Sequence, residues 1–193
     1  TSNLDMGEVD NHSFGISHLM STDLWEFGQL TYGFDHYHDE VDSFKNRFDS
    51  TTGSFVGTRT PTYPDDSRYE QTGAFLQWDV DLSPRVSAVA GVRHSHIAAA
   101  ATPIVDVDHD NDPGTPDVPT PVDIDPTFDN WSASIGINYQ VDEKWLLVSS
   151  ISEGFRAPNL DDLAATNENV QQSSADTPSI DLQPEQSLSY DVG

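Results

Sequence analysis

A two-residue alternation is the feature that most constrains the fold of this 193-residue chain. In the stretch "WSASIGINYQV", residues 131–141, the odd-numbered positions are apolar or aromatic, and the even-numbered positions are small or polar but uncharged. Successive side chains of a β-strand point to opposite sides of the sheet, so this pattern gives one apolar face and one polar face. Helical periodicity is almost absent. The sequence therefore predicts an all-β protein of antiparallel strands.

Similar alternation occurs along much of the chain. It is clear in residues 29–38, 73–82 and 85–96, and weaker in residues 12–20, 145–151 and 186–192. Together with residues 131–141, these segments predict about seven strands.

The connections between these segments are of two kinds. Residues 83–85 and 142–144 are minimal turns, whereas residues 43–70 and 99–127 are long, irregular and acidic. Short and long connections follow one another in turn, so all the short turns lie at one end of the sheet. Outer-membrane barrels have short periplasmic turns and longer extracellular loops. We therefore predict part of an up-and-down transmembrane β-barrel, with 43–70 and 99–127 as extracellular loops.

The length of the apolar face supports a membrane-spanning strand. Trp131 and Tyr139 bracket a face of eight residues, which spans ~27 Å at ~3.3 Å per residue. Tilted by ~40°, this strand crosses ~20 Å, close to the ~25 Å apolar band of such barrels. A soluble β-sandwich, in which the apolar faces pack on each other, is the alternative architecture.

Composition excludes several classes of function. The chain has 33 acidic and 8 basic residues and a formal net charge of -25, which argues against nucleic-acid binding because phosphate contacts need clustered Lys and Arg. There is no cysteine, so disulfides, thiolate metal sites and thiol nucleophiles are excluded. No serine-hydrolase elbow, zinc-protease motif or phosphate-binding glycine loop is present. We expect a protein that is not an enzyme.

The stretch "SISEGFRAPNLDDLA", residues 150–164, resembles a signature in the β-barrel domain of TonB-dependent outer-membrane receptors. In that family a strand leads into Gly-Phe-Arg-Ala-Pro, followed by Asn-Leu and an acidic pair. Residues 30–43, 63–95, 128–159 and 182–193 are similar to segments of the same domain and occur in the same order.

This resemblance implies a receptor that takes up a scarce ligand, such as an iron chelate or haem, across the outer membrane of a Gram-negative-type bacterium. The barrel of such a receptor has 22 strands in membrane lipid, and energy from the TonB complex releases its plug domain. About seven strands without a recognisable plug or TonB box predict an incomplete barrel over residues 1–193. We expect a portion of a receptor or a truncated gene product, which would not transport a ligand alone.

The resemblance is strongest to haem and iron-chelate receptors. Phe155, Arg156, Ala157 and Pro158 match the Phe-Arg-Ala-Pro box of haem receptors, but their Asn-Pro-Asn-Leu box is replaced by "SIDL" at 179–182. No histidine lies between Ala157 and Gly193, so the resemblance supplies no axial ligand for haem here.

We expect the signature to face the lumen and the ligand. Its candidate site residues are Phe155, Arg156, Pro158, Asn159, Asp161 and Asp162. A guanidinium pairs well with an anionic ligand, but we expect Arg156 to pair instead with Glu153, Asp161 or Asp162 and fix the loop on the wall. Pro158 ends the strand and Asn159 suits a turn.

The stretch "DVDHDNDPGTPD" suggests a second site. Asp106, Asp108 and Asp110 have the spacing of a calcium loop, with Asp112 and Asp117 as further ligands. Asn111 stands where an EF-hand requires Gly, and Pro113 and Pro116 stiffen the loop. An irregular calcium loop and a solvated acidic loop both stay open.

Two pairs of histidines share a strand face, His36 with His38 and His94 with His96. Without a third ligand in the pattern, they are predicted to lie at the lipid–water boundary rather than to bind a transition metal.

The alternative function is a secreted, acidic, calcium-stabilised β-sandwich that acts as a binding or adhesion module.

Overall fold

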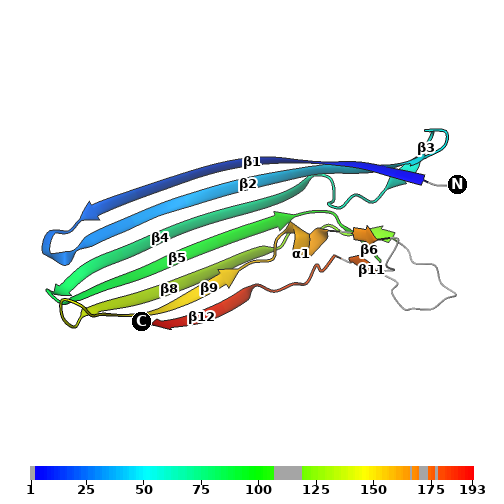
Figure 1. The fold of residues 1–193 in the computed structure, drawn as a ribbon. Helices are drawn as coiled ribbons and strands as arrows, with labels where there is room; N and C mark the ends of the chain where they lie inside the picture. The colour runs from blue at the N-terminus through cyan, green and yellow to red at the C-terminus, as the bar shows by residue number, and fades with distance from the viewer. Residues whose placement is uncertain (1–2, 107–118, 166, 170–173, 177) are drawn as a thin grey trace.

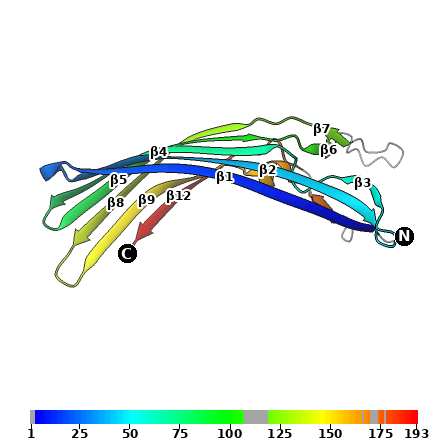
Figure 2. The same cartoon turned by 90° about the horizontal axis from the view of Figure 1, so that it is seen from above.

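The computed structural model describes residues 3–106, 119–165, 167–169, 174–176 and 178–193. The main sheet has eight antiparallel strands in the order β1-β2-β4-β5-β8-β9-β12, and β3 pairs with β2 beside this path. The strands are β1 (Asn3–Asp23), β2 (Gln29–Asp49), β3 (Phe55–Arg59), β4 (Ser67–Ser83), β5 (Val86–Ala100), β8 (Thr127–Gln140), β9 (Leu146–Arg156) and β12 (Glu185–Val192). Figures 1 and 2 show one curved, open sheet. The predicted up-and-down all-β architecture is confirmed.

Two small hairpins lie outside the main sheet. They pair β6 (Ile104–Asp106) with β7 (Pro119–Pro121), and β10 (Asn167–Asn169) with β11 (Ser174–Asp176). In the described part of the chain, no helix is long and apolar enough to cross a membrane.

The short turns all lie at one end of the sheet, as predicted (Figure 1). Pro84 and Arg85 join β4 to β5, and residues 141–145 join β8 to β9. A third turn, which the sequence pattern did not reveal, is the 3-10 helix η1 (Trp25–Phe27) between β1 and β2. The long connections lie at the opposite end.

The predicted loop boundaries were wrong in part. β2 continues to Asp49, β3 lies within 43–70, and β4 begins at Ser67. In the same way, β5 continues to Ala100, and β6 and β7 lie within 99–127. β1 begins nine residues before the predicted 12–20 segment. Charged residues interrupt the apolar alternation in the extensions of β1, β2 and β4, because a strand that projects beyond an apolar band needs no lipid-compatible face.

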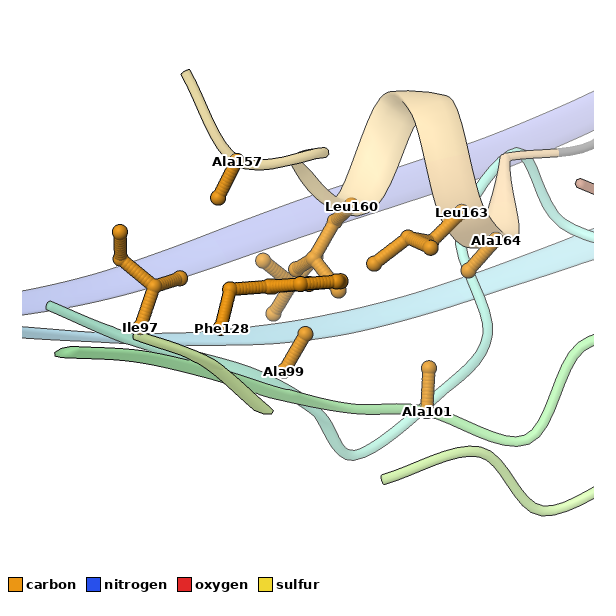
Figure 3. Close-up of a cluster of buried hydrophobic side chains, with 9 residues drawn as sticks. Ile97, Ala99, Ala101, Phe128, Ala157, Leu160, Leu163 and Ala164 are labelled. Carbon is orange, nitrogen blue, oxygen red and sulfur yellow. The ribbon is translucent and has the colours of Figure 1, made fainter. Parts of the chain in front are cut away.

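The two faces of the sheet differ in what covers them. The short helix α1 (Leu160–Ala164) packs on one face, which we call the inner face, against Ile97 and Phe128 (Figure 3). Buried apolar side chains gather between this helix and the sheet: Val41, Ile97, Ala99, Ala101, Phe128, Ala157, Leu160, Leu163 and Ala164. The main packing of the described chain is therefore the attachment of the signature segment to the wall.

The opposite, outer face carries the apolar residues of the alternating pattern. Trp131 is 67% exposed and Ile135 is 50% exposed. Cross-strand partners in the register share a face, and the partners of Ile135 are Ala90 and Ile151. A β-sandwich would bury these residues under a second sheet. No second sheet covers them among the described residues, so the sandwich alternative has no structural support.

Candidate functional site

The signature segment folds back over the inner face where β9 ends. Pro158 and Ala157 are buried, and Asn159 begins α1 as its N-cap. The Asn159 side chain accepts a hydrogen bond from the Asp162 N–H at 2.9 Å, and the Asp162 carboxylate accepts one from the Asn159 N–H at 3.1 Å. This reciprocal capping box satisfies two backbone donors at the start of the helix. Asn159 was predicted to form a turn, and the helix that follows it was not predicted.

Arg156 links this segment to the neighbouring strand. Its guanidinium donates to Asp162 at 2.8 Å and to Glu185 of β12 at 3.2 Å. Asp162 was one of its three predicted partners. Glu153, another of them, instead accepts the Ala133 backbone N–H at 2.9 Å, beyond the last β8–β9 pair. Arg156 therefore fixes the segment at the end of β9.

Two tyrosines, one in β4 and one in the segment that precedes it, attach the signature segment to this part of the wall. The Tyr63 hydroxyl donates to the Asp161 carboxylate, and the Tyr69 hydroxyl donates to the Pro158 carbonyl at 3.2 Å. The hydrogen bond to Asp161, together with burial, raises the pKa of Tyr63 above its ordinary value. Sequence reasoning did not pair these tyrosines with the signature, because the contacts join residues far apart in the chain.

A hollow of about 340 Å³ lies between α1 and the inner face of β1, β2 and β4. Among the predicted site residues, Asn159 and Asp161 line it. Tyr63, Tyr69 and Asp39 line the same hollow. Phe155 packs against the buried cluster and lines a second hollow of about 380 Å³ further along the inner face. Arg156, Pro158 and Asp162 hold the segment in place and line neither hollow.

An ion pair crosses the inner face of three strands beside the second hollow. Arg93 of β5 donates two hydrogen bonds to Asp35 of β2, both at 2.8 Å. Gly73 of β4 lies between them, and the Arg93 guanidinium occupies the space that a Cβ on Gly73 would take. An Asp, a Gly and an Arg at inner-face positions of neighbouring strands are the sequence signal for this pair.

Side chains of the inner face lean over glycines of the preceding strand elsewhere too. The Tyr37 ring of β2 lies over Gly15 of β1, and the Phe75 ring of β4 approaches Gly33 of β2. Three large side chains of the inner face, Tyr37, Phe75 and Arg93, therefore lie across the strands, each over a glycine of the preceding strand.

The predicted calcium ligands lie mostly outside the described residues. Asp106 ends β6, and its backbone pairs with Pro119, whereas Asp108, Asp110, Asp112 and Asp117 lie in the segment that is not described. Within the described ranges, no group of three His, Cys, Asp or Glu side chains is arranged to hold a metal ion. Calcium binding by residues 106–117 stays a prediction.

The histidine pairs lie on the outer face, and two of their partners are carboxylates. His38 contacts Glu70 at 2.9 Å, and His96 and His94 contact Asp129 at 2.9 and 3.4 Å. The alternation within one strand does not identify Asp129 as a neighbour of these histidines, since it comes from β8.

An open antiparallel sheet with short turns at one end, an uncovered apolar outer face and a polar inner face is the wall of a membrane-type β-barrel. The sequence model for the TonB dependent receptor-like β-barrel matches residues 2–193. The chain therefore belongs to this family, whose members are outer-membrane receptors and transporters. No curated protein sequence matches the chain.

Solved structures share the fold. The copper transporter OprC is 16% identical with a TM-score of 0.70, and the alignment covers 97% of this chain and 27% of that one. A double mutant of the Serratia marcescens hemophore receptor HasR, in complex with its hemophore HasA and heme, is 13% identical with a TM-score of 0.69. That alignment covers 97% of this chain and 30% of HasR. The chain thus spans less than a third of either protein.

Proposed function

We propose that this chain forms part of the wall of an outer-membrane receptor that takes up a scarce small ligand, such as an iron chelate or haem. The proposal rests on the difference in polarity between the two faces of the sheet. An apolar outer face suits lipid, and a polar inner face with two hollows and an attached helix suits a ligand-binding lumen. The neighbours OprC and HasR, described as a copper transporter and a hemophore receptor, support uptake as the class of activity.

Lipid contact is the first requirement of this proposal. We expect β circular dichroism and a monodisperse species only in detergent micelles or lipid, and aggregation in plain buffer. A soluble, reversibly unfolding monomer in buffer would contradict the proposal, because the outer face would then be covered by protein.

The ligand would contact the hollow beneath α1, which Asn159 and Asp161 line together with Tyr63 and Tyr69. Binding of haemin, ferric citrate and copper(II) to the protein in micelles can be followed by equilibrium dialysis. We expect one of these ligands to bind, and binding to weaken about tenfold in Asp161→Asn if the lost contact is charge-assisted. Asp191→Asn, on β12 and away from the hollow, is the matched control. Equal affinity in both variants would exclude Asp161 as a ligand contact.

We propose that the plug domain and the TonB complex act through parts of the receptor beyond this wall. Arg93 and Arg156 already have carboxylate partners on the same wall. They therefore serve to hold the wall in shape, and the hollow beneath α1 is the preferred ligand contact.

A further inference from the structure

Six of the seven histidines in the chain lie on the outer face of β1, β2 and β5, and the seventh, His109, lies outside the described residues. The strand register places them together, because cross-strand partners share a face. We call them the histidine belt: His12, His18, His36, His38, His94 and His96.

The belt lies where the apolar outer face ends. The row with Phe34 of β2, His94 of β5 and Trp131 of β8 is the last that has a Phe, Tyr or Trp on both β2 and β8, and Phe14 of β1 lies two rows further on, opposite His38. The next row runs His36, Thr72, His96 and Asp129. Rows on one face are two residues, or ~7 Å, apart along each strand. In a membrane, an edge of this kind lies at the depth of the lipid headgroups.

The histidines of the belt differ in their contacts. His94 and His96 of β5 contact the Asp129 carboxylate, and His38 of β2 contacts the Glu70 carboxylate. On β1 and β2, His18 stacks on the Phe34 ring, and His36 contacts the Thr72 hydroxyl at 2.9 Å. These last two imidazoles therefore face neutral groups.

The charge of this surface reverses when the imidazoles are protonated. The charged side chains that share its rows, or lie in the next row beyond His12, are the carboxylates of Asp10, Glu40, Asp42, Glu70 and Asp129 and the guanidinium of Arg68. Five carboxylates against one guanidinium leave four negative charges, and six protonated imidazoles turn this into two positive charges. Imidazole is the side chain that changes charge between about pH 5 and 8.

We propose that the histidine belt is a pH-dependent binding surface for the phosphate groups of anionic lipids in the surrounding leaflet. The belt repels these lipids at neutral pH and attracts them in mild acid, with His18 and His36 as the main phosphate contacts because they have no carboxylate partner of their own. This inference rests on the proposed function, since it requires the outer face to be in lipid.

The test compares lipid preference at two pH values. The protein in bilayers is probed with spin-labelled phosphatidylglycerol and spin-labelled phosphatidylcholine, and the motionally restricted fraction of each gives a relative association constant. We expect this constant to rise about fivefold between pH ~7.5 and ~5.5. The rise should disappear in His18→Gln/His36→Gln and persist in Lys144→Gln, which removes a positive charge at the opposite end of the sheet.

Each outcome is decisive. An equal preference at both pH values, or a rise that survives His18→Gln/His36→Gln, would overturn the lipid-phosphate surface while leaving the membrane location intact. Absence of any motionally restricted lipid at either pH would overturn the membrane location, and the belt proposal with it.

Discussion

Gly73 shows how one residue without a side chain determines a contact between two others. Asp35 and Arg93 belong to strands that are not neighbours, and β4 separates them. Their carboxylate and guanidinium meet above Gly73, where a Cβ would lie 2.0 Å from the Arg93 Nη2 atom and 2.9 Å from the Asp35 Oδ2 atom. The Arg93 side chain is 40% exposed to solvent and the Asp35 side chain is 19% exposed. Because solvent screens their charges, the pair makes a modest contribution to stability.

Gly73→Ala should displace the Arg93 guanidinium and break its two hydrogen bonds to Asp35. We expect the free energy of unfolding to fall by about 1 kcal/mol, at the low end for charged hydrogen bonds because of solvent screening. The measurement is a urea titration of the protein folded in micelles.

Two variants serve as controls for this prediction. Gly57→Ala should change stability by less than about 0.5 kcal/mol, since a Cβ at Gly57 meets nothing within 4 Å. In an Arg93→Gln background, Gly73→Ala should have a much smaller effect. A full effect in that background would show that Gly73 acts through something other than the ion pair.

At the scale of the element, α1 depends on its cap, because the helix has only five residues. Asn159→Ala removes the acceptor for the Asp162 N–H, and an N-cap contributes about 1 kcal/mol. We expect hydrogen exchange of residues 157–165 to become about fivefold faster, as measured by mass spectrometry. Asn159→Asp retains a capping oxygen and should keep the protection; loss of protection in both variants would argue against the capping role.

The attachment of α1 to the segment before β4 should depend on pH. Because the pKa of Tyr63 is raised by its hydrogen bond to Asp161, the neutral phenol is favoured in the folded protein. This contribution to stability is fully present below the unfolded value of about 10 and is lost as pH rises through the higher folded value.

Difference spectra at the tyrosinate absorption band, between the protein and its Tyr63→Phe variant, give the titration of Tyr63 alone. We expect a midpoint above the ordinary tyrosine value, returning toward it in Asp161→Ala. A midpoint at the ordinary value in the unaltered protein would show that the hydrogen bond does not persist in solution.

The strands within the apolar band were predictable from sequence, whereas α1 and the strand extensions were not. Residues 131–141 alternate because one face meets an apolar environment, and β8 follows that pattern. α1 is too short for helical periodicity, although Asn159 and Asp162 have the spacing of a capping box. The contacts of Tyr63 and Arg93 depend on register between distant segments, which the pattern of a single sequence does not specify.

For the whole molecule, a charge on the outer face should reduce stability much more than the same charge on the inner face. Ile135→Arg places a guanidinium in the middle of the outer face, and Ser134→Arg places it on the inner face one residue away. We expect Ile135→Arg to reduce the free energy of folding into lipid vesicles by about 2–4 kcal/mol, and Ser134→Arg to have little effect. Equal losses in both variants would contradict the assignment of faces.

The inner-face side chains that lean over glycines also limit how this wall can be rearranged in evolution. Insertion of a whole hairpin would keep neighbouring strands of this sheet antiparallel, but here Tyr37, Phe75 and Arg93 each use a glycine on the strand before their own. Inserting a hairpin between any two neighbouring strands among β1, β2, β4 and β5 would separate one of these large side chains from its glycine. The glycines thus favour one order of these strands. We expect an inserted hairpin to be better tolerated between β8 and β9, where the pairing already ends at Ser134.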